Sequence, residues 1–137
     1  MIQKRRELSA ALLGIVIALI LWITILGRET QTDGLLFYKP FHSLDHIWRD
    51  IQRGGFRGNF IGNIILFVPI GLLFPIMTGW NKRTIIVGAA FSFLIEAIQL
   101  ITRKGCFDPD DALLNTIGCL IGYVIFHAAK KRIIKTE

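Results

Sequence analysis

The chain has 137 residues, of which 53% are hydrophobic, so it is far more apolar than an ordinary soluble domain of this length. The net charge of +6 lies mostly at the ends of apolar segments, where basic residues suit an anionic membrane surface and require no nucleic-acid partner. The chain has two cysteines, Cys106 and Cys119, which are too few for a disulfide framework and are not spaced as the ligands of a zinc site are. The composition therefore argues against a nucleic-acid-binding or disulfide-rich domain and indicates a small integral membrane protein.

Four apolar segments are each long enough to cross a bilayer as a helix: residues 8–26, 60–77, 84–101 and 109–129. The sequence therefore predicts an all-α membrane protein, with four transmembrane helices in a compact bundle and a single domain over residues 1–137. The first segment follows three basic residues, as in a secretory signal, but its apolar run is too long and no cleavage site follows it. We expect it to be a retained anchor.

Basic residues are concentrated at one end of these segments, with few acidic neighbours: Lys4, Arg5, Arg6, Lys82, Arg83, Lys130, Lys131, Arg132 and Lys135. Because Lys and Arg resist translocation, this end is expected to be cytoplasmic, together with both chain termini. The protein is then a multi-pass protein of the plasma membrane.

The outer loop, residues 27–59, contains apolar residues at helical spacing: Leu44, Ile47, Trp48 and Ile51. This pattern predicts a short amphipathic interfacial helix, with Trp48 suited to the headgroup zone. A simple cap over the bundle and a role in gating or partner binding remain alternatives.

The second segment carries Asn63 near its outer end and contains Pro69, Gly71 and Pro75 further in. Each proline removes a helix hydrogen bond, so a kink is expected near mid-membrane. Neighbouring helices commonly resatisfy such a backbone in membranes, which favours a structural role for Pro69 and Gly71 over a hinge.

The third segment places a carboxylate inside an apolar helix. A charge at the centre of a membrane helix costs about 2.5–3.5 kcal/mol on insertion scales, so Glu96 requires a partner or a task. Spacings of four, four, three and four put it on one predicted face with other small or polar residues: Gly88, Ser92, Gln99 and Arg103.

The fourth segment starts with an acidic signature, Asp108-Pro109-Asp110-Asp111, which has the form of a capped helix start. Asp111 then begins a stripe with Asn115, Gly118 and Gly122, and the two glycines are expected to let another helix approach closely. Asn63, Glu96 and Asn115 should lie at one depth, roughly 5–9 Å below the outer boundary.

The sequence therefore predicts one polar pocket in the outer half of the membrane, with these candidate ligand-binding residues: Asn63, Glu96, Gln99, Arg103, Asp108, Asp111 and Asn115. Interhelical hydrogen bonding alone is an alternative role for the two asparagines. An enzyme here would rely on carboxylates, with Glu96, Asp108 and Asp111 as catalytic candidates. Their oxygens suit Mg²⁺, Mn²⁺ or Ca²⁺, but the spacing matches no dedicated metal loop, so we assign neither a metal nor another cofactor.

The combined motifs resemble the VanZ-like family of small membrane proteins, named after a teicoplanin-resistance accessory protein of Gram-positive bacteria. The element Asn-x-x-x-Phe-x-Pro-x-Gly is matched by Asn63, Phe67, Pro69 and Gly71. The later elements Glu-x-x-Gln, Arg, Asp-x-x-Asp-x-x-x-Asn and Gly-x-x-x-Gly are matched by Glu96, Gln99, Arg103, Asp108, Asp111, Asn115, Gly118 and Gly122. The match covers roughly residues 59–126. It is looser at Pro40-Phe41, where the preceding Asn of the family is replaced by apolar or aromatic residues.

This resemblance implies a membrane fold and a link to low-level teicoplanin resistance or to maintenance of the cell envelope, without naming a reaction. We expect the pocket to bind a membrane lipid or a lipid-linked cell-wall component. Two alternatives remain open. One is a carboxylate-based membrane enzyme, with or without a divalent cation, that modifies an envelope lipid. The other is a proton-coupled carrier, which would need polar groups to continue through the inner half, where Gly88 and Ser92 are a thin continuation.

Overall fold

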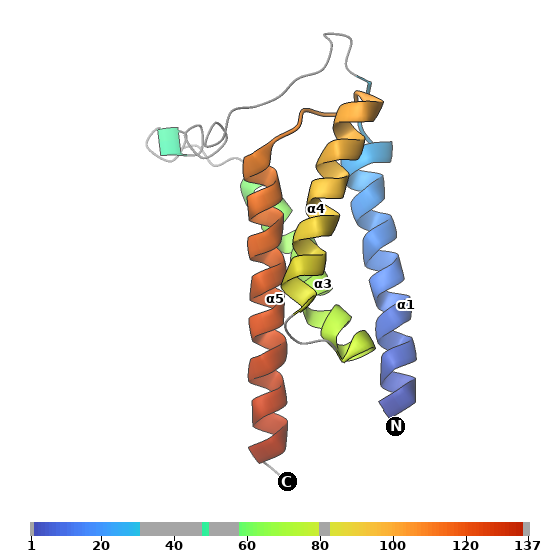
Figure 1. Ribbon diagram of the computed structural model, residues 1–137, viewed down its shortest axis with the longest axis vertical. Coiled ribbons are helices and arrows are strands. Elements are labelled where there is room, and N and C mark those ends of the chain that lie inside the picture. Colours follow the sequence, from blue (N-terminus) through green and yellow to red (C-terminus); the bar gives the residue numbers. More distant parts are fainter. Residues whose placement is uncertain (1, 31–47, 50–57, 80–82, 136–137) are drawn as a thin grey trace.

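The computed structural model describes residues 2–30, 48–49, 58–79 and 83–135, and these segments are helical apart from short connections (Figure 1). The helical elements, in chain order, are α1 (Ile2–Leu21), the π-helical turn η1 (Trp22–Leu26), α3 (Gly58–Thr78), α4 (Arg83–Thr102) and α5 (Pro109–Lys135). Both termini lie at the same end of the bundle, and the connection from α4 to α5 lies at the other end (Figure 1).

Four of the described helices are long and apolar enough to cross a membrane, with spans of 18 to 24 residues. At 1.5 Å per residue these spans are roughly 27–36 Å long, which matches the hydrocarbon thickness of a bilayer. The prediction of an all-α membrane protein with four spanning helices is therefore confirmed. Many large side chains point away from the bundle, as lipid-facing residues should; Ile15, Ile65, Ile86 and Val124 are examples.

The central helix is α3, which packs against α5 on one side and α1 on the other. It remains one helix through Pro69 and Pro75, and its C-terminal end lies beside α1 (Figure 1). A small buried core joins all four helices through Leu13, Ile20, Phe67, Ile70, Ile95 and Cys119. Cys119 is thus a packing residue with a free thiol.

Three glycines allow the backbones of α3 and α5 to touch. A Cβ added at Gly71 would collide with the carbonyl oxygen of Cys119. In the same way, a Cβ at Gly118 would collide with the Ile64 carbonyl, and one at Gly122 with the Val68 carbonyl. Any larger residue at these positions would force the two helices apart.

The amphipathic interfacial helix expected around Leu44, Ile47 and Ile51 lies outside the described residues. Only Trp48 and Arg49 of that segment are described, and both are helical and exposed.

Candidate functional site

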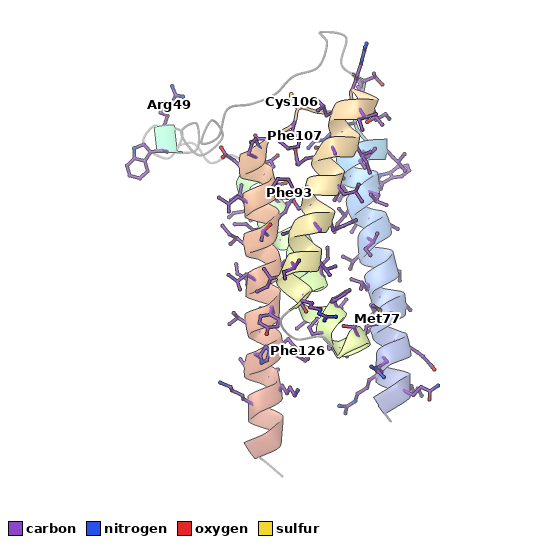
Figure 2. The ribbon with its side chains drawn as sticks, in the orientation of Figure 1. Arg49, Met77, Phe93, Cys106, Phe107 and Phe126 are labelled. Carbon is purple, nitrogen blue, oxygen red and sulfur yellow. The ribbon has the colours of Figure 1, made fainter. Side chains whose placement is uncertain are left out.

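The buried face of α4 carries the polar residues of the third segment. Gly88, Ser92, Glu96 and Gln99 are all buried, and Glu96 is only 2% exposed. This face turns toward the start of α5 and the connection that leads into it. Figure 2 shows Cys106 and Phe107 in that connection, between the upper ends of α4 and α5.

Glu96 is held by the backbone just before α5. Its Oε2 accepts a hydrogen bond from the Asp108 N–H at 2.9 Å. The Asp108 side chain in turn caps α5, because its Oδ1 accepts from the Asp110 N–H at 2.9 Å. The helix begins at Pro109, as the sequence predicts. A buried carboxylate on α4 and the N-terminus of α5 are thereby joined directly.

Further polar groups surround this contact. Asp111, in the first turn of α5, is close enough to Glu96 for the two carboxylates to act on one another electrostatically. The Asn63 side chain of α3 lies beside Asp111. The Asn63 amide acts there as a hydrogen-bond donor to the Asp111 carboxylate, although its buried Nδ2 atom makes no hydrogen bond of normal geometry among the described residues. The amide donor thus lies against a carboxylate in a weak contact.

One turn deeper, side chains join α4 and α5 through a second set of hydrogen bonds. Asn115 donates from Nδ2 to Ser92 Oγ at 2.9 Å, and Ser92 donates from Oγ to the Ala112 carbonyl at 3.4 Å. Both side chains are buried. Asn63 and Asp111 are partly buried, and we call the following residues together the buried polar cluster: Asn63, Ser92, Glu96, Asp108, Asp111 and Asn115.

Gln99 has a different neighbour. It donates from Nε2 to the carbonyl of Thr24 at 2.9 Å. Thr24 lies in η1, the π-helical turn that ends the first span, and its own Oγ1 donates to the Ile20 carbonyl at 2.7 Å. Gln99 therefore ties α4 to the end of the first span.

Arg103 does not continue the buried face of α4. The helix ends at Thr102, and Arg103 is exposed with a φ of 56°, in the left-handed region. The Arg103 N–H bonds the Leu100 carbonyl at 3.2 Å, and the Lys104 N–H bonds the Gln99 carbonyl at 2.9 Å. This pair of bonds is a Schellman motif, in which glycine usually occupies the left-handed position. Because α4 ends one residue before Arg103, helical spacing does not place Arg103 on the face that carries Glu96.

Arg28 is a basic residue whose charge acts on these carboxylates, and it is not among the site residues predicted from the sequence. It follows η1 and acts electrostatically on both Glu96 and Asp111. Its guanidinium packs against Gly105, where an added Cβ would lie 3.1 Å from Nη1. A glycine opposite a basic residue gives no local sequence signal, because the two are brought together only by the fold.

The described residues hold no group of three or more His, Cys, Asp or Glu side chains arranged to bind a metal ion. Instead the cluster offers carboxylate acceptors from Glu96 and Asp111, a poorly bonded amide donor from Asn63, and the positive charge of Arg28 at its edge. Such a mixture suits a ligand that carries both hydrogen-bond donors and acceptors.

Comparison with known proteins places these residues in a wider context. The family model described as VanZ/LLP1 matches residues 10–131, a range that contains the whole buried polar cluster. A relative from Enterococcus faecium named "Protein VanZ" is 27% identical over 130 residues, which covers 90% of this chain and 76% of that protein. No solved structure matches the chain.

Proposed function

The chain belongs to the VanZ/LLP1 family, and from this premise we propose that its buried polar cluster binds the polar part of a lipid or lipid-linked envelope component. The protein acts in the plasma membrane of a Gram-positive cell. By occupying or sequestering such a component, it lowers the action of teicoplanin, an antibiotic that carries an acyl tail and targets cell-wall precursor. Low-level resistance and envelope maintenance are then two results of one binding activity.

The proposed orientation puts both termini in the cytoplasm. The N- and C-termini lie at one end of the bundle, and the basic residues Lys4, Arg5, Arg6, Lys130 and Lys131 lie at the same end (Figure 1). Basic residues at helix ends favour the cytoplasmic side. The buried polar cluster then lies in the outer half of the membrane, where envelope lipids are exposed.

The observation that carries the proposal is the group of polar side chains at the start of α5, where Asn63, Glu96 and Asp111 from three helices lie beside one another. The Nδ2 atom of Asn63 is buried there and makes only a poor hydrogen bond to Asp111. A buried donor left fully unbonded costs about 1–3 kcal/mol, so a poorly bonded donor carries part of that cost. A ligand oxygen in good geometry at Nδ2 would reduce it.

The charges of the cluster narrow the class of ligand. Carboxylates accept hydrogen bonds from hydroxyl, amide N–H or ammonium groups, and they repel a bare phosphate. Arg28 provides one positive charge near Glu96 and Asp111. A headgroup rich in hydroxyl and amide groups, such as the sugar or peptide portion of a lipid-linked precursor, therefore fits better than a simple phosphodiester.

The test is expression in a susceptible Gram-positive host, followed by growth on teicoplanin and on vancomycin. The wild-type chain should reduce susceptibility to teicoplanin alone, and Asn63→Ala, Glu96→Gln and Asn115→Ala should each abolish that shift. Ile65→Ala is a matched control, because Ile65 is exposed on the same helix as Asn63. Wild-type behaviour of all three cluster variants, expressed at normal level, would refute the proposal.

A second candidate function is a carboxylate-based membrane enzyme that modifies an envelope lipid. The observation in its favour is the electrostatic proximity of Glu96 and Asp111, with Asp108 beside them. This candidate predicts a lipid product that accumulates with time and disappears in Glu96→Gln. Loss of that product on chelation would further assign a divalent cation. Saturable binding of unchanged lipid favours the first function instead.

A further inference from the structure

A groove opens at the other end of the bundle, between α1, α3 and α5. Its volume is about 700 Å³, within the range of roughly 300–1,000 Å³ that is typical of small-ligand sites. We call it the basic groove and define it by the residues that matter for its chemistry: Arg5, Arg6, Leu8, Leu72, Phe126 and Lys130. Figure 2 shows Phe126 on α5 and Met77 on α3 at this end.

The basic groove is separate from the buried polar cluster. On α5 it is lined by Phe126 and Lys130, whereas the cluster uses Asp111 and Asn115. Along α5, Lys130 follows Asp111 by 19 positions, which correspond to roughly 28 Å of helix. Phe126 follows Asn115 by 11 positions, which correspond to roughly 16 Å. A ligand in the groove therefore touches none of the groups that carry the proposed function.

One of the three basic side chains in the groove is anchored. Arg6 donates from Nε to the Met77 carbonyl at 3.0 Å, near the C-terminal end of α3. That end is closed by Gly79, which has a φ of 72° and bonds the Pro75 carbonyl at 2.9 Å. The anchored guanidinium keeps further N–H donors for a ligand and holds its charge at the rim without a large loss of side-chain entropy on binding.

The lining of the groove combines two chemistries. Arg5, Arg6 and Lys130 supply three positive charges from two helices, while Leu8, Leu72 and Phe126 supply apolar surface that continues into the membrane. Among the described residues that line it, none is acidic. An occupant must therefore be anionic at one end and apolar at the other.

We propose that the basic groove binds an anionic phospholipid, with its phosphate between Arg5, Arg6 and Lys130 and an acyl chain along Leu8, Leu72 and Phe126. Basic pockets between membrane helices are suited to anionic headgroups, because charge attraction and chain burial act at the same place. A second copy of this chain that docked through the same groove, in a two-fold arrangement, would instead bring its three positive charges against the same three charges. Charge complementarity thus favours the lipid.

The first test compares two charge-matched pairs of substitutions in the purified full-length chain. Binding of phosphatidylglycerol and of phosphatidylcholine with identical acyl chains is measured by native mass spectrometry in neutral detergent. Arg5→Gln with Lys130→Gln removes two groove cations, and Lys4→Gln with Lys131→Gln removes two exposed cations outside the groove. Each groove cation should contribute roughly fivefold to the affinity for phosphatidylglycerol, so the variant with Arg5→Gln and Lys130→Gln should bind this lipid about 25-fold more weakly. The variant with Lys4→Gln and Lys131→Gln should lose less than about twofold.

The second test fills the groove without changing its charge. Ala129 lines the groove, whereas its neighbour Ala128 is exposed outside it. Ala129→Trp should abolish the preference for phosphatidylglycerol, and Ala128→Trp should retain it. The proposal is overturned by equal losses in the two charge pairs, by wild-type binding in Ala129→Trp, or by the absence of any preference for the anionic lipid in the wild type.

Discussion

Glu96 on α4 and the backbone of Asp108 are joined by a hydrogen bond of 2.9 Å, in which the carboxylate accepts from the amide. The contact explains how a carboxylate is tolerated in an apolar helix: it lies at the positive end of α5, whose first turn attracts negative charge. Glu96 therefore has a structural role in joining α4 to α5. Any functional role must be separated from that one by experiment.

Comparison of Glu96→Gln with Glu96→Ala distinguishes the structural role of Glu96 from a role in ligand binding. Glutamine keeps an oxygen that can accept the Asp108 N–H, so the protein should unfold at nearly the wild-type temperature in detergent. Alanine removes the acceptor and should destabilise the protein by about 1–3 kcal/mol. If the charge itself binds ligand, Glu96→Gln should still lose teicoplanin protection. Equal melting temperatures for the two variants would show that the hydrogen bond contributes nothing measurable.

A double-mutant cycle tests the deeper contact between α4 and α5. Asn115→Ala and Ser92→Ala each remove one partner of the 2.9 Å hydrogen bond. Their coupling free energy should be about 0.6–1.7 kcal/mol, the range found for hydrogen bonds between membrane helices. The measurement is unfolding by SDS titration from mixed micelles. Strict additivity of the two single effects would contradict the contact.

Gly118→Ala should separate α3 from α5. The new Cβ would collide with the Ile64 carbonyl, and a backbone collision of this kind costs about 1–3 kcal/mol or more. Gly62→Ala, on the facing helix, is the matched control because an added Cβ there meets nothing within 4 Å. The control should be neutral or stabilising, since alanine is the better helix former. Similar melting temperatures in SDS for both variants would argue against the close α3–α5 contact.

Arg103→Gly should stabilise the protein. Arg103 occupies the left-handed position of the Schellman motif, where a residue with a side chain costs about 1 kcal/mol more than glycine. The free energy of unfolding should therefore rise by about that amount. If the guanidinium also contacts ligand, teicoplanin protection should fall while stability rises. A variant with lower stability would show that the side chain stabilises the fold.

Arg28→Gln should impair the proposed teicoplanin protection, because it removes the positive charge that acts on Glu96 and Asp111. Arg28→Lys retains the charge and should restore part of the activity. Lys104→Gln is the control, since it removes a positive charge from the end of α4 without changing Arg28. An equal loss in Arg28→Gln and Lys104→Gln would indicate a general charge effect at this end of the bundle.

The spanning helices and the start of α5 could be predicted from the sequence because both depend on local patterns. Apolar length determines a spanning helix, and Asp108 followed by Pro109 determines a helix start. The common face of Ser92, Glu96 and Gln99 likewise follows from helical spacing alone. These features need no knowledge of which helices are neighbours.

Arg28 and Arg103 show what the sequence could not supply. The effect of Arg28 on Glu96 depends on how the end of the first span packs beside α4, which periodicity does not encode. The position of Arg103 depends on a helix end that forms without the usual glycine. The sequence therefore contains no sign that α4 stops at Thr102, and helical spacing extends the predicted face to Arg103. The partner of Glu96 is a backbone N–H, and such a donor has no side-chain signature.

The hydrogen bonds between α4 and α5 join two segments that are synthesised one after the other. Glu96 and Ser92 leave the ribosome before their partners Asp108 and Asn115, which belong to the segment synthesised next. A nascent chain that has inserted only as far as α4 therefore carries a carboxylate without its amide partner. The polar contacts of Glu96 and Ser92 can therefore form only once α5 lies beside α4.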